Sequence, residues 1–149
     1  MRISFDVDDT LICGPEVPTE QHVPWWRRYW YPERLRHGTR QLIRELHARR
    51  HTLWIYTTSY RGPRYLRRWF RSFGVPLEGV VNQDIHDRVI KRSQYPFYPP
   101  SKYPPAFGID LHIDDSEGVA IEGERFQFRV LVISPNDQDW VTRILKAVS

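Results

Sequence analysis

The chain has little cysteine and little lysine, and it lacks a long apolar run. Cys13 is the single cysteine among 149 residues, so an intramolecular disulfide is excluded and no oxidising compartment is indicated. We expect Cys13 to be a structural thiol, because no obvious activating base adjoins it. No segment predicts a membrane span, and the N-terminal residues do not resemble a signal peptide. The sequence therefore predicts a cytoplasmic protein without a membrane partner.

Lysine is scarce among the basic residues. Lys91, Lys102 and Lys146 are the lysines of the chain, and the remainder of its 22 Lys and Arg residues are arginines. Against 18 Asp and Glu residues they give a formal net charge of +4. A mildly basic surface attracts anionic substrates, but an ordinary solvated surface can have the same composition. Nucleic acid is therefore one open partner class among several.

A length of 149 residues with 40% hydrophobic residues suits one compact domain over 1–149. Strand-like and helix-like segments alternate along it. Strands are expected at 2–7, 52–56, 80–81, 109–113 and 129–133, and helices at 33–50, 62–74, 84–92 and from Asn136 or Asp137 to about Val148. Repeated βα units predict an α/β fold, a Rossmann-like domain with a parallel five-stranded sheet and helices on both faces.

Two segments interrupt this pattern. The proline-rich stretch at about 94–105 excludes continuous helix or sheet and predicts a stiff loop. An insertion at about 13–32 contains the aromatic and arginine-rich run Trp25–Tyr31, and we expect it to be irregular. These aromatics and arginines can stack on a base or ring and pair with phosphate. Equally, they can cover the domain as a loop or form the contact of a homo-oligomer.

Two acidic clusters each close an expected strand. Asp6 and Asp8 follow the first strand, and Asp114 and Asp115 end the fourth, more than a hundred residues later. In open α/β sheets the carboxyl ends of the strands meet at one edge, where ligands bind. Carboxylates gathered there repel one another unless they share a cation, and oxygen ligands without supporting His or Cys favour Mg²⁺ over zinc. The sequence therefore predicts a Mg²⁺ site that handles phosphate.

These ordered motifs resemble those of the haloacid dehalogenase-like (HAD) hydrolases, most of whose members are phosphatases or phosphotransferases. The run Asp6-Val7-Asp8-Asp9-Thr10 resembles the family's first motif, which implies that Asp6 is the nucleophile and Asp8 the general acid/base. The apolar strand that ends in Thr57 resembles the second motif, whose Thr or Ser holds the substrate phosphate. Thr58 and Ser59 are alternatives for this role if the strand ends later.

The run Ile113-Asp114-Asp115-Ser116 resembles the fourth motif of the family. The resemblance implies that Mg²⁺ is held by the Asp6 carboxylate, the backbone carbonyl of Asp8 and the Asp115 carboxylate. Asp114 would then support this site or contact Mg²⁺ through a water molecule.

The third motif of the family is a lysine before the acidic pair, which leaves Lys102 and Lys91. Lys102 stands in a Lys-x-Pro context that resembles the family's, although it precedes Asp114 by only twelve residues. We expect Lys102 to be the phosphate-binding lysine. Arg61 has two interpretations, as a further guanidinium in the phosphate pocket or as an exposed residue at a helix start.

The resemblance implies a Mg²⁺-dependent phosphomonoester hydrolase without a large cap domain, acting through an aspartyl-phosphate on Asp6. Its substrate would be a phosphorylated small molecule or an exposed phosphate on a macromolecule. A receiver-type signalling domain is disfavoured, because its phosphoacceptor lies on a middle strand of the chain. A non-catalytic phosphate-binding protein is disfavoured by the presence of both Asp6 and Asp8. A phosphotransferase of the same fold usually needs a site sealed from water.

Overall fold

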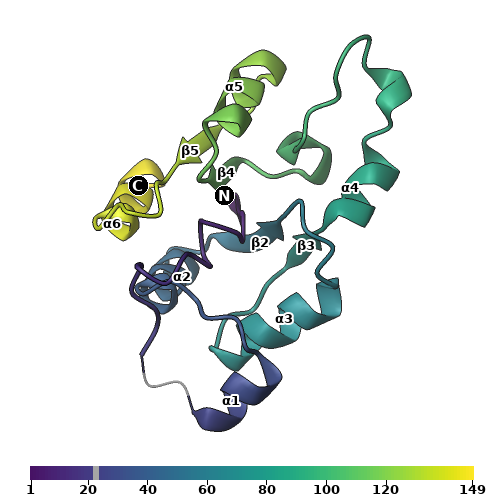
Figure 1. Cartoon of the computed structure of the whole chain (residues 1–149). Helices are drawn as coiled ribbons and strands as arrows, with labels where there is room; N and C mark the ends of the chain where they lie inside the picture. The colour runs from purple at the N-terminus through teal and green to yellow at the C-terminus, as the bar shows by residue number, and fades with distance from the viewer. Residues whose placement is uncertain (22–23) are drawn as a thin grey trace.

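The computed structural model describes residues 1–21 and 24–149 and contains one parallel sheet. Its strands are β1 (Arg2–Phe5), β2 (Thr52–Tyr56), β3 (Gly79–Val81), β4 (Leu111–Asp114) and β5 (Val130–Val132). They lie in the order β3-β2-β1-β4-β5, with every neighbouring pair parallel (Figure 1). The chain thus moves from the central β1 to one side, and then crosses back to the other, which is the arrangement of Rossmann-like folds. The predicted fold class is confirmed.

Helices cover both faces of the sheet. The α-helices are α1 (Trp25–Trp30), α2 (Thr39–Ala48), α3 (Pro63–Ser72), α4 (Gln83–Val89), α5 (Glu117–Phe126) and α6 (Trp140–Ala147), and the 3₁₀ helices are η1 (Arg92–Gln94) and η2 (Pro104–Phe107). The helices α2, α3 and α6 pack on one face, whereas α4 and α5 lie on the other (Figure 1). None of the described helices is long and apolar enough to cross a membrane.

The two faces of the sheet are made by alternate residues of each strand, because successive side chains of a strand point in opposite directions. In β2, Leu53 and Ile55 join the large core beneath α2, α3 and α6. Trp54 and Tyr56 point to the other face and form a smaller core with residues of β3, α4 and η2. Apolar residues on both faces are what a sheet covered on both sides requires.

The sequence of α3 explains its place in the fold. Pro63 stands in its first turn, where a missing N–H costs no hydrogen bond. Leu66, Trp69 and Phe70 are buried at helical spacing against the sheet. The helix is followed by Gly74, whose φ of 78° is a conformation that glycine adopts without strain. A predicted helix at 62–74 is therefore confirmed within a residue or two at each end.

Two other helices start later than the sequence pattern predicts. The helix expected at 33–50 begins only at Thr39, because Gly38 has a φ of 91° and the Thr39 hydroxyl donates to the Arg36 carbonyl oxygen in the turn before the helix. The last helix begins at Trp140, because Asp137 forms a turn in which its carboxylate accepts the N–H two residues later. In the second case a polar side chain that indicated a helix start, Asp137, lies in the turn before the helix.

Two helices were not predicted at all. The short α1 lies inside the insertion that we expected to be irregular; residues 22–23 of that insertion lie outside the described residues. The helix α5 contains Gly118 and Gly123, which weaken a helical pattern. A Cβ at Gly123 would lie 2.8 Å from the Phe128 carbonyl oxygen. Glycine is needed there for the close approach of α5 to the segment that leads into β5.

Candidate active site

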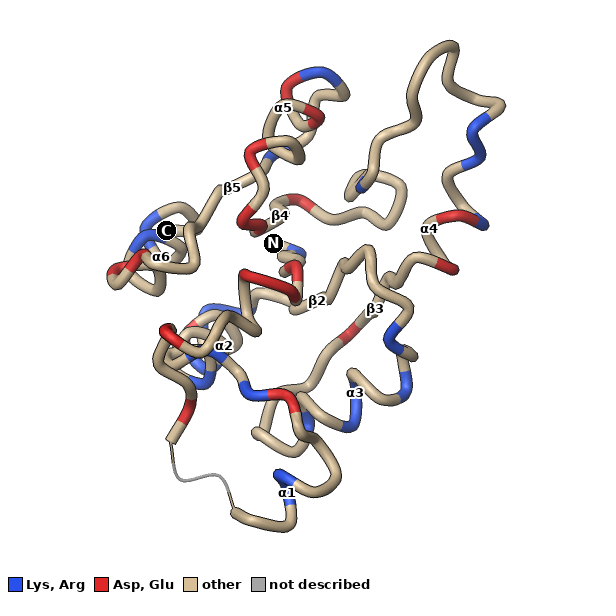
Figure 2. Tube along the Cα trace, in the orientation of Figure 1, with Lys and Arg blue, Asp and Glu red and all other residues tan. Residues whose placement is uncertain are grey.

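Asp6 follows β1 directly and lies at the carboxyl edge of the sheet, next to the end of β4. Its backbone N–H donates to the Ile113 carbonyl oxygen over 2.8 Å, which extends the pairing of the two strands. Only 6% of the Asp6 surface is exposed. Figure 2 shows the acidic segments that follow β1 and β4 near each other at the centre of the molecule. A carboxylate buried at this position needs a positive charge or hydrogen bonds to compensate its lost hydration.

Lys102 supplies that positive charge. Its Nζ donates to Oδ1 of Asp6 over 2.7 Å and to Oδ2 of Asp114 over 2.6 Å. Lys102 and Asp114 are almost completely buried. One ammonium group therefore joins two buried carboxylates that come from the ends of adjacent strands.

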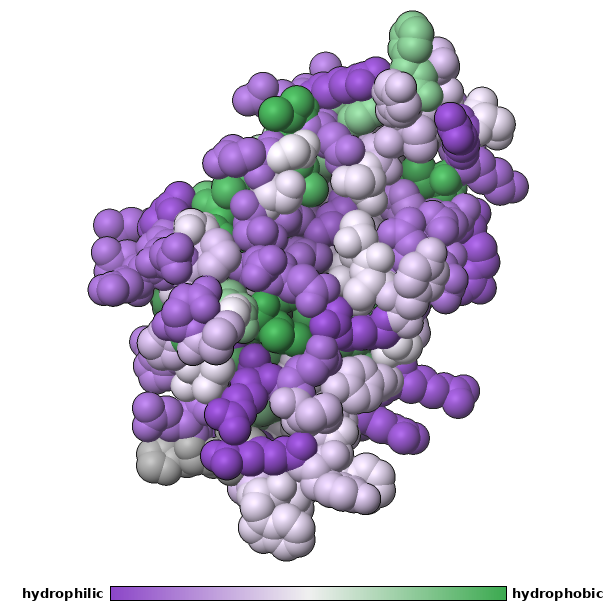
Figure 3. All heavy atoms as spheres, viewed as in Figure 1, coloured by the Kyte–Doolittle hydropathy of each residue, from purple (hydrophilic) through white to green (hydrophobic). Residues whose placement is uncertain are grey.

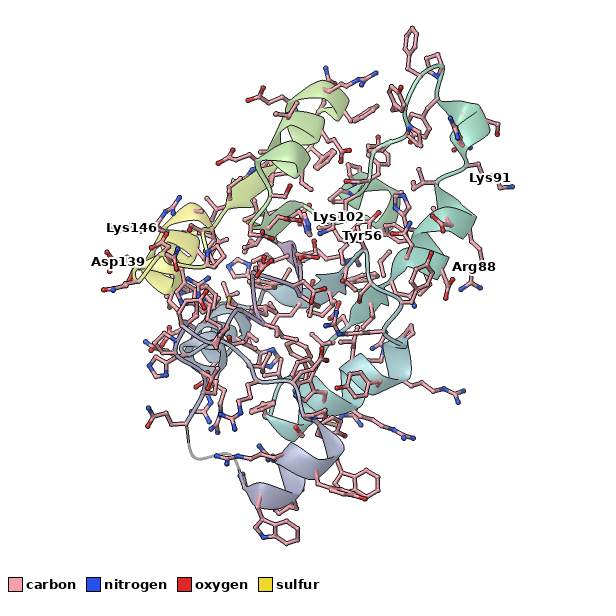
Figure 4. The ribbon with its side chains drawn as sticks, viewed as in Figure 1. Tyr56, Arg88, Lys91, Lys102, Asp139 and Lys146 are labelled. Atoms are coloured by element: carbon pink, nitrogen blue, oxygen red, sulfur yellow. The ribbon has the colours of Figure 1, made fainter. Side chains whose placement is uncertain are left out.

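The structure separates the two lysines that the sequence left as alternatives. Figure 4 places Lys102 beside Tyr56 in the interior, whereas Lys91 points outward beyond α4. Lys91 is exposed and precedes η1. Only η2 and a short turn separate Lys102 from β4, so a spacing of twelve residues is enough to bring its side chain to Asp114.

Hydrogen bonds on both sides hold the backbone around Lys102 in place. The N–H of Tyr103 donates to the hydroxyl of Tyr56, a buried residue of β2, over 2.9 Å. On the other side, the Ser101 N–H and hydroxyl donate to the Glu122 carboxylate of α5 over 3.0 and 2.7 Å. The loop is thereby fixed to the sheet and to α5, and the ammonium group is held in position before any ligand binds.

Asp114 is further held by a buried polar chain. The His112 Nε2 donates to Asp114 Oδ2 over 2.8 Å, and the Ser4 hydroxyl lies 2.7 Å from His112 Nδ1. The Ser116 N–H donates to Asp114 Oδ1 over 2.9 Å. The alternation of His112 with apolar neighbours predicts a packed residue, and it is completely buried. Both oxygens of Asp114 thus have donors, which fixes the orientation of this carboxylate.

The carboxylates of the cluster differ in their affinity for protons. Burial raises the pKa of Asp6 from 3.8 to about 6; Lys102 opposes this increase and Asp114 adds to it. Burial also acts to raise the pKa of Asp114, but the hydrogen bond from His112 and the charge of Lys102 hold it well below its usual range. Burial lowers the pKa of His112 to about 4, so the ring is neutral at pH 7. The charged partner of Asp114 is therefore Lys102.

A third carboxylate completes a possible metal site. Oxygen atoms of Asp6, Asp114 and Asp115 lie within 4.8 Å of one another. Burial raises the pKa of Asp115, and the negative charge of Asp114 adds to this increase. The Thr10 hydroxyl reaches Asp115 Oδ1 over 3.4 Å. Three close carboxylates of this kind fit a hard cation such as Mg²⁺, which relieves their mutual repulsion.

Asp8 lies apart from these three carboxylates. Its side chain is 55% exposed, and its two oxygens accept from the Arg61 guanidinium, each over 2.9 Å. Arg61 also pairs with Glu33, which follows α1. The two carboxylates raise the pKa of Arg61, mainly through their hydrogen bonds, so it stays charged. The Asp8 side chain is thus accessible at the site and is oriented by a two-point contact.

Thr57 follows β2 directly and is 1% exposed. Its Oγ1 donates to Ser59 Oγ and accepts the Ser59 N–H, both over 3.1 Å. Thr58, in contrast, is exposed. β2 ends at Tyr56, so Thr57 is the first residue after the strand, and the hydroxyl of Ser59 lies in the same turn. Both hydroxyls remain candidates for a contact with phosphate.

No protein-family model matches the sequence, and a search of curated proteins finds no match. Among solved structures, a HAD-superfamily hydrolase of subfamily IA, variant 1, from Geobacter sulfurreducens PCA matches over 98% of this chain and 98% of that chain, at 12% identity with a TM-score of 0.59. This chain has the fold of a HAD-superfamily hydrolase.

A chain from the Pnkp1/Rnl/Hen1 complex matches with a TM-score of 0.53 and 8% identity, over 89% of this chain. The match covers 45% of that chain, so this protein spans about half its length. One fold supports many activities, so the function depends on the side chains at the carboxyl edge of the sheet.

Most members of this edge were predictable from the sequence, but their partners were not. Asp6, Lys102 and Asp114 form one cluster in the structure, with Asp115 beside them. The Ser4 and His112 pair was not predicted, since it depends on the register of β1 against β4. Nor was the contact of Arg61 with Asp8 and Glu33, which makes Arg61 a partly buried, ion-paired residue rather than an exposed one.

Proposed function

We propose that the protein is a Mg²⁺-dependent phosphomonoester hydrolase that works through an aspartyl-phosphate on Asp6. The observation that supports this most is the buried ammonium of Lys102 shared by Asp6 and Asp114, with Asp115 close by. Such a cluster at the carboxyl edge of a HAD-like sheet combines a fixed carboxylate, a fixed cation and a set of hard oxygen ligands. These are the groups that transfer of a phosphoryl group needs.

In the first half of the reaction a carboxylate oxygen of Asp6 attacks phosphorus. Because Lys102 holds Oδ1, we assign the attack to Oδ2. The bond from Asp6 to phosphorus forms as the ester bond to the leaving oxygen breaks. Lys102 and the Thr57 hydroxyl would hold the phosphate oxygens, whose negative charge otherwise repels a carboxylate nucleophile. The product of this half is an aspartyl-phosphate and a free alcohol.

Asp8 would act as the general acid and base. In its protonated form it gives a proton to the leaving oxygen, and the resulting carboxylate then takes a proton from water. The water oxygen attacks phosphorus, and the bond to Asp6 breaks to release inorganic phosphate. The exposed position of Asp8 lets it reach a bound ester, and Arg61 orients its carboxylate form, the one that takes a proton from water.

Mg²⁺ would be held by the carboxylates of Asp6 and Asp115 and the backbone carbonyl of Asp8, with Asp114 in support. When bound, it supplies positive charge that neutralises the phosphate and keeps the carboxylates ionised. Its ligands come from the ends of β1 and β4, the two strands that Lys102 also joins.

The test is release of phosphate from a panel of phosphomonoesters by the purified protein, with Mg²⁺ and with EDTA. Asp6→Asn should abolish turnover because Asn is not a nucleophile here, and Lys91→Met, an exposed lysine far from the cluster, should not. Acid quenching of a reaction in progress should leave protein-bound phosphate that hydroxylamine removes, as an acyl phosphate requires.

Three outcomes would contradict the proposal. They are undiminished turnover in Asp6→Asn, turnover that does not need a divalent cation, and bound phosphate that resists hydroxylamine. A folded protein that binds Mg²⁺ but hydrolyses no ester in the panel, phosphorylated oligonucleotides included, would favour a phosphate-binding protein without turnover.

A further inference from the structure

The helices α1 and α3 together present an unusual surface. On α1, Trp25, Tyr29 and Trp30 are 81%, 79% and 68% exposed. Figure 3 shows the side chains of this helix projecting from the lower end of the molecule, away from the body. Trp26 is exposed as well, at 45%. Packing removes large aromatic rings from water at a gain in free energy, so four of them exposed on one short helix call for an occupant. We name this helix and the outer face of α3 the α1–α3 surface.

The outer face of α3 carries positive charge that no acidic residue of the helix neutralises. Arg64, Arg68 and Arg71 are exposed and follow one another at spacings of four and three residues, so they form one stripe. Neither α1 nor α3 contains an acidic residue, and Arg28 on α1 is exposed as well. Like charges at these spacings destabilise a helix. An anionic partner with several charges would remove that repulsion.

This surface continues into the candidate active site. Arg27 of α1 lies over the Phe73 ring at the far end of α3, and Tyr31 lies 5.8 Å from the Tyr65 ring nearer its start. The Tyr65 hydroxyl donates to Glu33 over 3.3 Å, and Glu33 pairs with the arginine that holds Asp8. The helix α1 thus runs back along α3 toward the site, as Figure 1 shows.

A further exposed aromatic residue lies next to Arg61 in the chain. Tyr60 is 68% exposed and precedes Arg61, which holds the Asp8 carboxylate. Exposed aromatic residues therefore stand on α1, which lies alongside α3, and directly before Arg61, next to the start of the arginine stripe in the chain. The ten residues of α3 span about 15 Å, which leaves room for more than one nucleotide.

We infer that the α1–α3 surface binds single-stranded nucleic acid and that the substrate of Asp6 is a phosphate at the end of such a strand. This inference rests on the proposed function. The arginines of α3 pair with backbone phosphates, and the exposed rings of α1 and Tyr60 stack on unpaired bases. A duplex buries the faces of its bases and offers nothing for these rings to stack on.

Charge and aromatic rings also suit an anionic membrane surface, but continuity with the site favours nucleic acid. A strand laid along α3 delivers its terminal phosphate to the carboxyl edge of the sheet. A lipid bilayer in contact with α1 would have no such relation to Asp6. The helix α1 also has only six residues and two arginines, so its hydrophobic face is small.

The test measures fluorescence anisotropy of a labelled single strand of about 12 nucleotides with a terminal phosphate, in EDTA so that no Mg²⁺-dependent turnover occurs. The matched duplex and vesicles of phosphatidylserine and phosphatidylcholine are the alternative ligands. Binding should be tightest to the single strand. Between about 50 and 200 mM salt it should weaken with a slope of about 0.7 for each phosphate contacted.

Two variants should produce different signatures. Reversing the stripe in Arg64→Glu/Arg68→Glu/Arg71→Glu should reduce the salt slope by about 2, the value for three lost phosphate contacts. Trp25→Ala/Tyr29→Ala should weaken binding about tenfold or more and leave the salt slope unchanged, because stacking involves no counterions. The control Arg88→Glu/Arg92→Glu/Arg125→Glu changes the same number of exposed charges elsewhere and should have the smaller effect.

Several results would overturn the inference. They are a dissociation constant above about 100 µM for the single strand, equal or tighter binding of the duplex, and binding of the vesicles alone. Equal losses of affinity for the single strand in the stripe and control variants would also overturn it. Because binding is measured without turnover, its failure leaves the phosphatase proposal standing if simple esters are hydrolysed. Conversely, a protein that binds the single strand with these signatures but hydrolyses no phosphate ester would refute the phosphatase proposal. It would leave the binding role of the α1–α3 surface standing.

Discussion

Replacing Asp6 by Asn should stabilise the metal-free protein at neutral pH, although it should abolish turnover. The pKa of Asp6 is about 6 in the folded protein against an ordinary value of 3.8, mainly because the carboxylate is buried. The folded state therefore binds a proton more tightly than the unfolded state. Stability that is present below pH 3.8 is lost as the pH rises through 6.

The size of this loss follows from the two pKa values. Each pKa unit corresponds to about 1.36 kcal/mol, so the difference between 3.8 and about 6 amounts to roughly 3 kcal/mol. Asn has nearly the same shape and no charge, and its carbonyl oxygen can still accept the hydrogen bond from Lys102. The stability of the variant should therefore exceed that of the wild type by up to roughly 3 kcal/mol above pH 6 and by little in acid.

Urea denaturation followed by tryptophan fluorescence in EDTA, at several pH values from about 4.5 to 8, measures this difference. Only the difference between the two proteins is informative, because Asp114 and the other titrating groups are present in both. A difference that does not change with pH, or a variant that is less stable at pH 7.5, would refute the reasoning. Added Mg²⁺ should reverse the order, since it binds the folded wild type and stabilises it.

Other substitutions test separate parts of the structure. Lys102→Met should lower kcat by about a hundredfold to a thousandfold, as expected when one fixed charge at the reacting group is removed, whereas Lys91→Met should leave phosphate release unchanged. Arg61→Gln should lower kcat by about tenfold to a hundredfold in the same assay, because the general acid/base loses its two-point contact. Gly79→Ala should cost about 1–3 kcal/mol in thermal or urea unfolding, since its Cβ would lie 2.2 Å from the indole on β2; Gly62→Ala, with no atom within 4 Å, is the control.

The sheet and its acidic edge were predictable because each depends on local patterns. Apolar runs such as 52–56 identify buried strands, and polar residues placed directly after them fall at the carboxyl edge in any parallel sheet. That is why Asp6 and Asp114 could be expected to meet. Lys102 could be chosen over Lys91 only through the resemblance to the HAD motifs, and the structure shows why its short spacing from Asp114 suffices.

The other features of the site and of the fold depend on contacts between residues far apart in the sequence, which no local pattern contains. Ser4 and His112 are partners in the register of β1 and β4, and a shift of one residue would point them to opposite faces. The contact of Asp8 with Arg61 joins residues 53 positions apart through a loop and a helix start. The helix α5 was missed because Gly123 weakens a helical pattern, while the tertiary packing requires it.

The distribution of the lysines makes the protein selectively reactive toward amine reagents. Lys91 and Lys146 are exposed on opposite sides of the molecule, whereas Lys102 is enclosed with its two carboxylates (Figure 4). An acylating reagent should therefore modify the exposed lysines first and provide points for attachment or crosslinking that do not touch the acidic cluster. Slow acylation of Lys102 would then report how often its loop opens, because the remaining Lys and Arg residues are arginines, which such reagents leave unchanged.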